Sequence, residues 1–302
     1  MIDFINRVNN ILYKELRVKH LKVIYKTLLG DMPDPKIVFT NFNNILKEVT
    51  FLTEDEIFEL NFIEYFLLLT ELRITSIGDT IFGQLENNTT VDFNLNRIKS
   101  QLQDNLNKFN NKLYQHDNIT VVTSLPTINE ILTIKNVNTF YGCFIKQIKI
   151  HDTVTYLGGL SLDEKNKIFE QLPAKISSFI IKDVIANIEY FNTVNLVSYF
   201  TAIQNITLAF NYNINNLVMY LKFLFGDGLL PLYENIFGLC KIGNFTPEYI
   251  ENCTPGEYLL FVKKLEQLNA QTKSQSNNTN ENFVQDDFDL PPITSEADLN
   301  SL

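Results

Sequence analysis

The pattern of apolar and polar positions predicts helices at the start of the chain. Within residues 2–29, apolar side chains such as Leu12 and Leu16 recur near the helical period, and the opposite face is basic. We expect one long helix or two short ones there, followed by a helix over 40–49. The segment 31–35 separates them, because each of its two prolines restricts its own backbone and that of the preceding residue.

Two capping boxes mark helix starts further along the chain. In each, a Thr or Ser hydroxyl and a Glu carboxylate three residues later satisfy free backbone amides. Thr53 and Glu56 open a run of recurring Phe and Leu residues that is too short and too charged to span a bilayer, so a single core helix is expected. Ser161 and Glu164 open another helix, which Pro173 ends or redirects.

The middle of the chain predicts strands. Gly, Asp and Asn-Asn turn signals separate β-rich runs at 80–85 and 89–95, which we interpret as a hairpin. Within 91–95 apolar and polar residues alternate, as in a strand with one wet face. A polar helical segment is expected to follow at 97–114. Three further strands are then expected, at 119–124, about 132–136 and 143–156.

The C-terminal part returns to helical patterns, interrupted by a short strand at 206–210. Residues from 174 to about 200 are expected to be helical for at least their first half. The whole pattern predicts an α+β fold that is predominantly helical, with helical ends around small antiparallel hairpins and no parallel sheet. The expected parts are an N-terminal helical segment at 1–52 and a helix plus β-hairpin region at 53–160. A C-terminal helical region with one short strand at 161–268 and a disordered acidic tail at 269–302 are expected to follow.

Composition narrows the possible functions. The chain is 45% hydrophobic, which is enough to fill a core, and its net charge of -10 argues against a broad nucleic-acid-binding surface. From residue 269 on, one Lys stands against six acids, which predicts disorder. Cys143, Cys240 and Cys253 lie far apart without a Cys-x-x-Cys motif, so we expect a reducing cytoplasm and no zinc. The N-terminus has neither a signal-peptide block nor a membrane span, which also indicates the cytoplasm.

No group of residues predicts catalysis. His20, His116 and His151 lie in no nucleophile motif, and a lone histidine is more often structural. The glycines at 158–159 and 226–228 lack the spacing of a phosphate-binding loop and predict turns. We therefore expect no enzyme and no cofactor or metal.

Segment 246–261 contains two Thr-Pro pairs eight positions apart, which predict two helix starts in close succession. Thr254 is interpreted as an N-cap, with Pro255 at the first helical position and Glu257 closing a capping box. Thr246 starts the short helix before it. The two helices should form a corner whose aromatic and aliphatic side chains are available for packing.

Two segments resemble a known family. Residues 226–265, with Lys241 near the end of one helix and Glu257 at the start of the last, resemble the C-terminal part of the small baseplate hub assembly proteins of T-even-type contractile-tailed phages. Residues 62–81, with Arg73 and Gly78 after a helix, resemble the same family's helix and first hairpin strand.

The chain departs from this family at its cysteines. Many members carry Cys-x-x-Cys knuckles in two hairpins, but the corresponding stretches here, 82–93 and 196–210, contain no cysteine, and no arginine follows Glu257. A zinc role is therefore not carried over.

The resemblance implies a non-enzymatic morphogenetic protein, structural or assembling, of the baseplate hub. Its partners would be other tail or hub proteins, with no membrane and no nucleic acid. It would occur in the host cytoplasm during assembly and in the virion tail. The residues expected to bind partners are Tyr233, Phe237, Tyr249, Ile250, Tyr258 and Phe261, and those expected to have structural roles are Arg73, Gly78, Thr254 and Glu257.

Two alternatives stay open at this point. The basic face of the N-terminal helix, with Lys14, Arg17, Lys19 and Lys22, would suit a replication or nucleic-acid accessory factor. A tail assembly chaperone that is absent from the mature virion would suit the acidic, aromatic-rich chain equally well.

Overall fold

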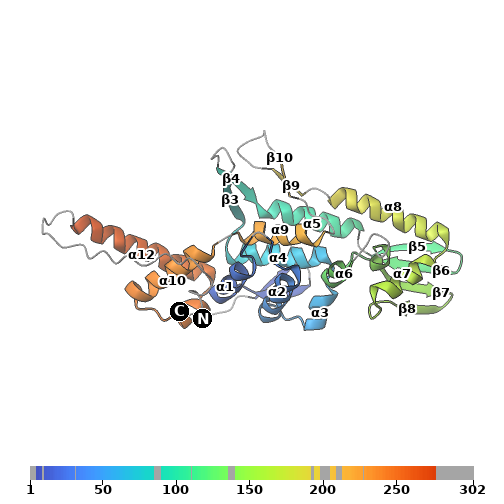
Figure 1. Ribbon diagram of the computed structural model, residues 1–302, viewed down its shortest axis with the longest axis horizontal. Helices are drawn as coiled ribbons and strands as arrows, with labels where there is room; N and C mark the ends of the chain where they lie inside the picture. Colours follow the sequence, from blue (N-terminus) through green and yellow to red (C-terminus); the bar gives the residue numbers. More distant parts are fainter. Residues whose placement is uncertain are drawn as a thin grey trace. The chain divides into compact units, whose positions relative to one another are not determined.

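The computed structural model describes residues 5–8, 10–30, 32–84, 90–109, 111–134, 140–191, 194–197, 205–208, 213–226 and 228–276 (Figure 1). The chain divides into two compact units, Met1–Val262 and Lys263–Leu302. The helices are α1 (Val18–Thr27), α2 (Pro35–Val49), α3 (Glu54–Glu59), α4 (Phe62–Ser76), α5 (Leu95–Phe109), α6 (Ile128–Thr133), the 3-10 helix η2 (Tyr141–Phe144), α7 (Leu162–Glu170), α8 (Ala174–Phe191), α9 (Ile214–Phe225), α10 (Leu229–Gly243), α11 (Pro247–Asn252) and α12 (Pro255–Ser276).

All strand pairs among the described residues are antiparallel. Three sheets are two-stranded hairpins, β1-β2, β3-β4 and β9-β10, and the fourth has the order β5-β6-β7-β8. The strands are β1 (Ile5–Val8), β2 (Ile11–Lys14), β3 (Thr80–Gln84), β4 (Thr90–Asn94), β5 (Lys112–His116), β6 (Ile119–Thr123), β7 (Ile145–Ile150), β8 (Thr153–Tyr156), β9 (Val194–Val197) and β10 (Asn205–Leu208). The prediction of a mainly helical α+β fold with small antiparallel sheets is confirmed.

The prediction of a helix from residue 2 is wrong for its first half. Val8 pairs with Ile11, so β1 and β2 form a hairpin, and α1 begins only at Val18. The sequence has Asn at positions 9 and 10, a residue type that favours turns, and this favours the hairpin over a continuous helix. Tyr13 is buried and bridges to Thr50, which ties the hairpin to the end of α2.

The expected single core helix after Thr53 is two helices. The capping box of Thr53 and Glu56 is confirmed, but it opens the short α3. The Asn61 side chain then accepts hydrogen bonds from the backbone N–H of Ile63 (3.1 Å) and of Glu64 (3.0 Å) and starts α4. A second N-cap inside an apolar run thus breaks the helix.

α4 forms the centre of the core. Eleven of its 15 residues are buried, which is typical of a helix that is covered on most sides. α5 and α9 pack against it. Phe66 meets Tyr220 of α9 edge to face at 5.2 Å, and the hydroxyl groups of Tyr220 and Thr70 lie 3.2 Å apart.

Three further local predictions differ from the structure. Residues up to Thr133 are helical where a strand was expected at 132–136, because Thr127 and Glu130 form a capping box that starts α6. β5 occupies the end of the helix expected at 97–114, in a segment where half-buried and exposed residues alternate, as along a strand. A second strand, β9, pairs with β10 where one strand was expected. Residues 135–139, 209–210 and 277–302 lie outside the described residues, and α12 extends to Ser276, past the expected start of the acidic tail at 269.

Candidate partner-binding surfaces

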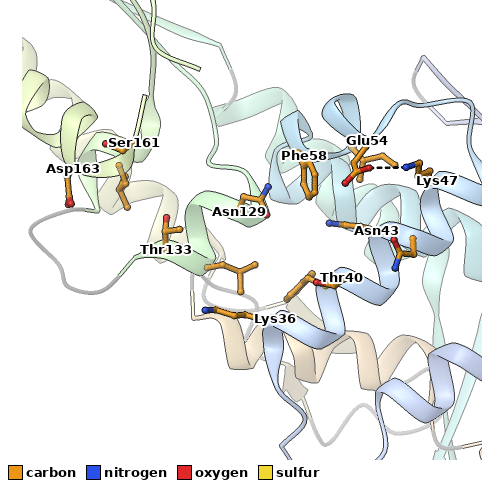
Figure 2. A pocket seen from close by; sticks show the side chains of 15 residues that line it. Lys36, Thr40, Asn43, Lys47, Glu54, Phe58, Asn129, Thr133, Ser161 and Asp163 are labelled. Atoms are coloured by element: carbon orange, nitrogen blue, oxygen red, sulfur yellow. Dashed lines mark hydrogen bonds and ion pairs between the residues drawn. The ribbon is translucent and has the colours of Figure 1, made fainter. Parts of the chain in front are cut away.

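A cleft of about 720 Å³ opens between α2 and α3 on one side and α6 and the start of α7 on the other (Figure 2). α2 lines it with residues three or four positions apart, which share one helical face. The polar side chains along its walls include Lys36, Thr40, Asn43 and Lys47 from α2, Asn129 and Thr133 from α6, and Ser161 and Asp163 at the start of α7. Amide and hydroxyl groups therefore face the opening from both walls.

The charges of this cleft balance. Lys36 and Lys47 stand against Glu54 and Asp163, and the Lys47 Nζ lies 2.9 Å from the Glu54 Oε2. Phe58 adds a partly exposed ring. The lining contains no histidine and no cysteine. The cleft is suited to a neutral, polar surface and not to a phosphate backbone.

One carboxylate, whose side chain is only 14% exposed, holds the α6 and α7 wall in place. Glu130 accepts hydrogen bonds from the Nζ of Lys165 (2.5 Å), the Nζ of Lys146 (2.9 Å) and the backbone N–H of Thr127 (2.8 Å). Burial by itself would raise the pKa of Glu130, but the two ammonium groups outweigh it and the pKa is lowered. α6, β7 and α7 are thereby joined at a single ionised group.

Two of the three thiols lack the features of reactive cysteines. Cys143 and Cys253 are buried, and burial raises the pKa of both thiols, whereas reactive cysteines have lowered values. Among the described residues, no group of three or more His, Cys, Asp or Glu is arranged to hold a metal.

The second candidate surface is the helical corner of α10, α11 and the start of α12. Asn244 adopts a left-handed conformation (φ 54°) and ends α10. The Thr246 hydroxyl then accepts from the backbone N–H of Tyr249 at 3.2 Å and starts α11. At the start of α12, the Thr254 N–H donates to the Glu257 carboxylate (2.8 Å), and the Glu257 N–H donates to the Thr254 hydroxyl (3.3 Å). The close succession of helix starts thus produces a sharp turn with satisfied backbone groups.

Three rings form an aromatic stack at this corner: Phe245, Tyr249 and Phe261. The Phe245 ring stacks on Tyr249 at 5.6 Å with an interplanar angle of 16°, and its centroid lies 4.9 Å from that of Phe261. Gly243 leaves the space for it, because a Cβ there would lie 2.8 Å from the Phe245 ring. Tyr249 is 48% exposed and Leu260 is exposed as well. The stack is therefore a preformed apolar feature that water still reaches.

The six residues expected to bind partners have different positions. Phe237 is 66% exposed, with the Lys241 Nζ 5.7 Å from its ring centroid. Tyr233 lies under the ammonium groups of α1, with the Lys22 Nζ at 5.3 Å. Ile250 and Tyr258 are buried, and Phe261 is half-buried within the aromatic stack. Exposed apolar area is thus found at Phe237 and at the stack, while Ile250 and Tyr258 pack inside the corner.

Arg73 and Gly78 lie together at the end of α4. The Arg73 Nε donates to the carbonyl of Leu224 (2.9 Å) near the C-terminus of α9, and its Nη1 donates to the carbonyl of Gly78 (2.5 Å). Gly78 has a φ of 129°, which favours glycine. Arg73 is buried, and it joins the ends of two core helices to the start of β3.

The basic face of α1 is occupied by contacts within the chain. The Nζ of Lys19 lies 2.7 Å from the Glu48 Oε2, and the Nζ of Lys22 lies 2.7 Å from the Glu251 Oε1. The Arg17 Nη1 donates to the Asn252 carbonyl at 3.1 Å. The contact of Lys19 joins α1 to α2, and the contacts of Lys22 and Arg17 attach α11 to α1.

Comparison with known proteins identifies the family. A family model described as T4 bacteriophage base plate protein matches residues 8–199, which are 192 of the 302 residues. The chain belongs to this family of T4-type phage baseplate proteins, and its class of function is a structural or assembly role in the baseplate. No significant match was found among curated proteins or among solved structures. Within the described residues, no helix has the length and apolar character needed to cross a membrane.

The matched range contains only one of the two segments on which the resemblance rests. Residues 62–81 lie inside it, and residues 226–265, with the corner, lie outside. We did not predict the cleft from the sequence, although the polar residues on one face of α2 could have indicated it. Phe245 was missed as well, although Gly243 and Asn244 indicate a helix end beside an aromatic residue.

Proposed function

We propose that the chain is a non-enzymatic component of the baseplate hub that binds other baseplate proteins through its C-terminal corner. The observation that carries this proposal is the aromatic stack of Phe245, Tyr249 and Phe261, held by capped helices and partly open to water. Protein interfaces concentrate their binding energy in such rigid aromatic anchors. The family membership supports the baseplate, and the resemblance of residues 226–265 supports the hub.

Catalysis has little support in the described residues. The buried thiols have raised pKa values, and the cleft is lined by amides, hydroxyls and balanced charges. A structural protein needs none of the reactive arrangements that an enzyme requires.

The nucleic-acid alternative loses its main support. It relied on Lys14, Arg17, Lys19 and Lys22, and two of these ammonium groups are paired with Glu48 and Glu251. A phosphate backbone would have to compete with these carboxylates. The discriminating observation is salt-dependent retention on DNA that is lost when the four residues are neutralised. The proposal expects no retention at low salt.

The proposal can be tested by complementation of a phage that lacks this gene. We expect the Tyr249→Ala variant to reduce the fraction of tails that carry a baseplate by at least about tenfold, the scale of an interface hot spot. Phe179→Ala is the matched control, because Phe179 on α8 is an aromatic residue with the same 48% exposure. Equal complementation by the two variants would reject the corner as the binding surface.

The chaperone alternative is separated by a second readout of the same experiment. Mass spectrometry of purified virions should detect the chain if it is a resident hub component. Baseplate-bearing virions that consistently lack the chain would overturn residence and support a transient assembly role.

A further inference from the structure

The two edge strands of the four-stranded sheet, β5 and β8, differ in their contacts. On β5, Lys112 and Tyr114 reach Asp183 of α8, with the Lys112 Nζ at 2.8 Å and the Tyr114 hydroxyl at 2.6 Å from its Oδ2. β8 forms the other edge, and all four of its residues are exposed. In the described part of the chain, β8 pairs with β7 alone.

The hydrogen bonds between β7 and β8 determine which backbone groups of β8 point outward. The N–H of Leu157 donates to the carbonyl of Lys146 (2.9 Å). In an antiparallel pair every second residue is hydrogen-bonded to the neighbouring strand, so Thr155, two positions before Leu157, is also hydrogen-bonded to β7. On the other side of β7, the His151 N–H donates to the Asn118 carbonyl, which fits the same alternation. The N–H and C=O groups of the alternate residues, Val154 and Tyr156, therefore point away from the sheet.

Apart from its short length of four residues, the outer edge lacks the usual protection against pairing. Exposed edge strands are commonly blocked by charged side chains, prolines or bulges. The sequence of β8 is Thr-Val-Thr-Tyr, without a charge or a proline, and its pairing with β7 is regular. Val154 and Tyr156 lie on the same face and are 40% and 76% exposed.

We propose that β8 pairs with β8 of a second copy of this chain, antiparallel and in one register. Thr155 lies on the twofold axis opposite Thr155 of the second copy, and Val154 lies opposite Tyr156 of the second copy. This register uses the outward N–H and C=O groups of both residues in both copies and forms four hydrogen bonds. It also places a β-branched residue beside an aromatic one on both sides of the axis, a favourable cross-strand pair.

A second copy fits this edge better than an arbitrary strand. In the symmetric register the only directly opposed pairs in β8 are Val with Tyr and Thr with Thr, so no charged side chain is placed opposite another. The two four-stranded sheets become one sheet of eight strands. A contact of this size is below that of a permanent dimer, so the association is expected to be weak and dependent on concentration.

The register can be tested by charge at Thr155. Sedimentation equilibrium of the full chain, up to about 1 mM and with enough salt to screen the net charge, should show reversible dimerisation. Thr155→Lys and Thr155→Glu each place like charges opposite one another across the axis and should each give monomers. An equimolar mixture of the two variants should recover dimers, because the opposed charges then attract.

A covalent trap and a control complete the test. Thr155→Cys, in a chain that also carries Cys240→Ser, should form a disulfide-linked dimer on mild oxidation, since opposed residues of a non-hydrogen-bonded pair lie at a suitable distance. The equivalent change on the opposite edge strand, Leu113→Cys, places an exposed thiol away from β8 and should not cross-link. Unchanged melting temperatures of the Thr155 variants show that they fold. A wild-type chain that stays monomeric, a dimer that survives Thr155→Lys, or a mixture that stays monomeric would each overturn the proposal.

Discussion

The part of the chain inside the family match and the C-terminal corner outside it are built differently. In the matched part, the buried charge of Lys165 has a partner: the side chain is 3% exposed, and its ammonium group meets Glu130. At the corner, the backbone is equally well capped, yet the aromatic stack leaves Tyr249 open to water. In the matched part, side chains thus stabilise the interior through buried contacts. At the corner, they form a preformed apolar surface.

The largest expected effect belongs to the buried ion cluster. Glu130→Ala leaves the ammonium group of Lys165 buried without a carboxylate, which should lower the free energy of unfolding by about 3–5 kcal/mol. Glu54→Ala is the control, because its pair with Lys47 is exposed and should contribute less than about 1 kcal/mol. Urea unfolding measures both changes. Similar losses for the two variants would remove the distinction between fixed and surface charges.

The next prediction compares the effect of replacing one glycine in each region. A Cβ at Gly142 would lie 2.7 Å from the backbone nitrogen of Asn166, so α7 would have to move, and Gly142→Ala should cost about 1–3 kcal/mol. A Cβ at Gly243 would meet only the Phe245 ring, which can rotate. We expect Gly243→Ala to cost less in urea unfolding than Gly142→Ala while it alters the aromatic stack. The reverse order would contradict the comparison.

The matched part should also respond to pH through His20. Its Nδ1 accepts from the Arg17 N–H (2.8 Å), and burial lowers the pKa of the ring below its usual 6.5. The unfolded chain therefore binds a proton at a higher pH than the folded chain, so stability falls as the pH drops below about 6.5 towards the lowered value. Melting temperatures across this window should fall less steeply for His20→Asn. An identical slope would show that His20 is not the titrating group.

The smallest expected effect on stability is at the corner surface. Tyr249→Ala removes a side chain that is 48% exposed, so the free energy of unfolding should change by only about 0.5 kcal/mol. Thermal unfolding measures this change. A large loss would mean that the stack is part of the core, and the effect of this variant on baseplates would then have a trivial cause.

Local signals were sufficient to predict the fold class and several elements. The capping boxes at Thr53 and Ser161 and the hairpin of β3 and β4 follow from short motifs. The hairpin of β1 and β2 was missed because its apolar residues also fit a helical period. Asn61 was missed because a cap inside an apolar run is a weak signal.

The surfaces were harder to predict, because their residues are distant in sequence. The pair of Lys22 and Glu251 joins positions 229 apart, and no local pattern indicates it. The walls of the cleft come from segments that are separated by the core helix α4 and the sheet. Only the Thr-Pro pairs of the corner, where Thr246 and Thr254 are close in sequence, indicated a surface in advance.

The central claim, that the chain works through its corner, is tested most directly by cross-linking mass spectrometry of assembling tails in infected cells. Lys241 lies beside Phe237 at the corner, and Lys175 is an exposed lysine on α8. We expect that cross-links to other baseplate proteins come from Lys241, and that Tyr249→Ala removes them. Cross-links that come from Lys175 instead, and persist in the variant, would contradict it.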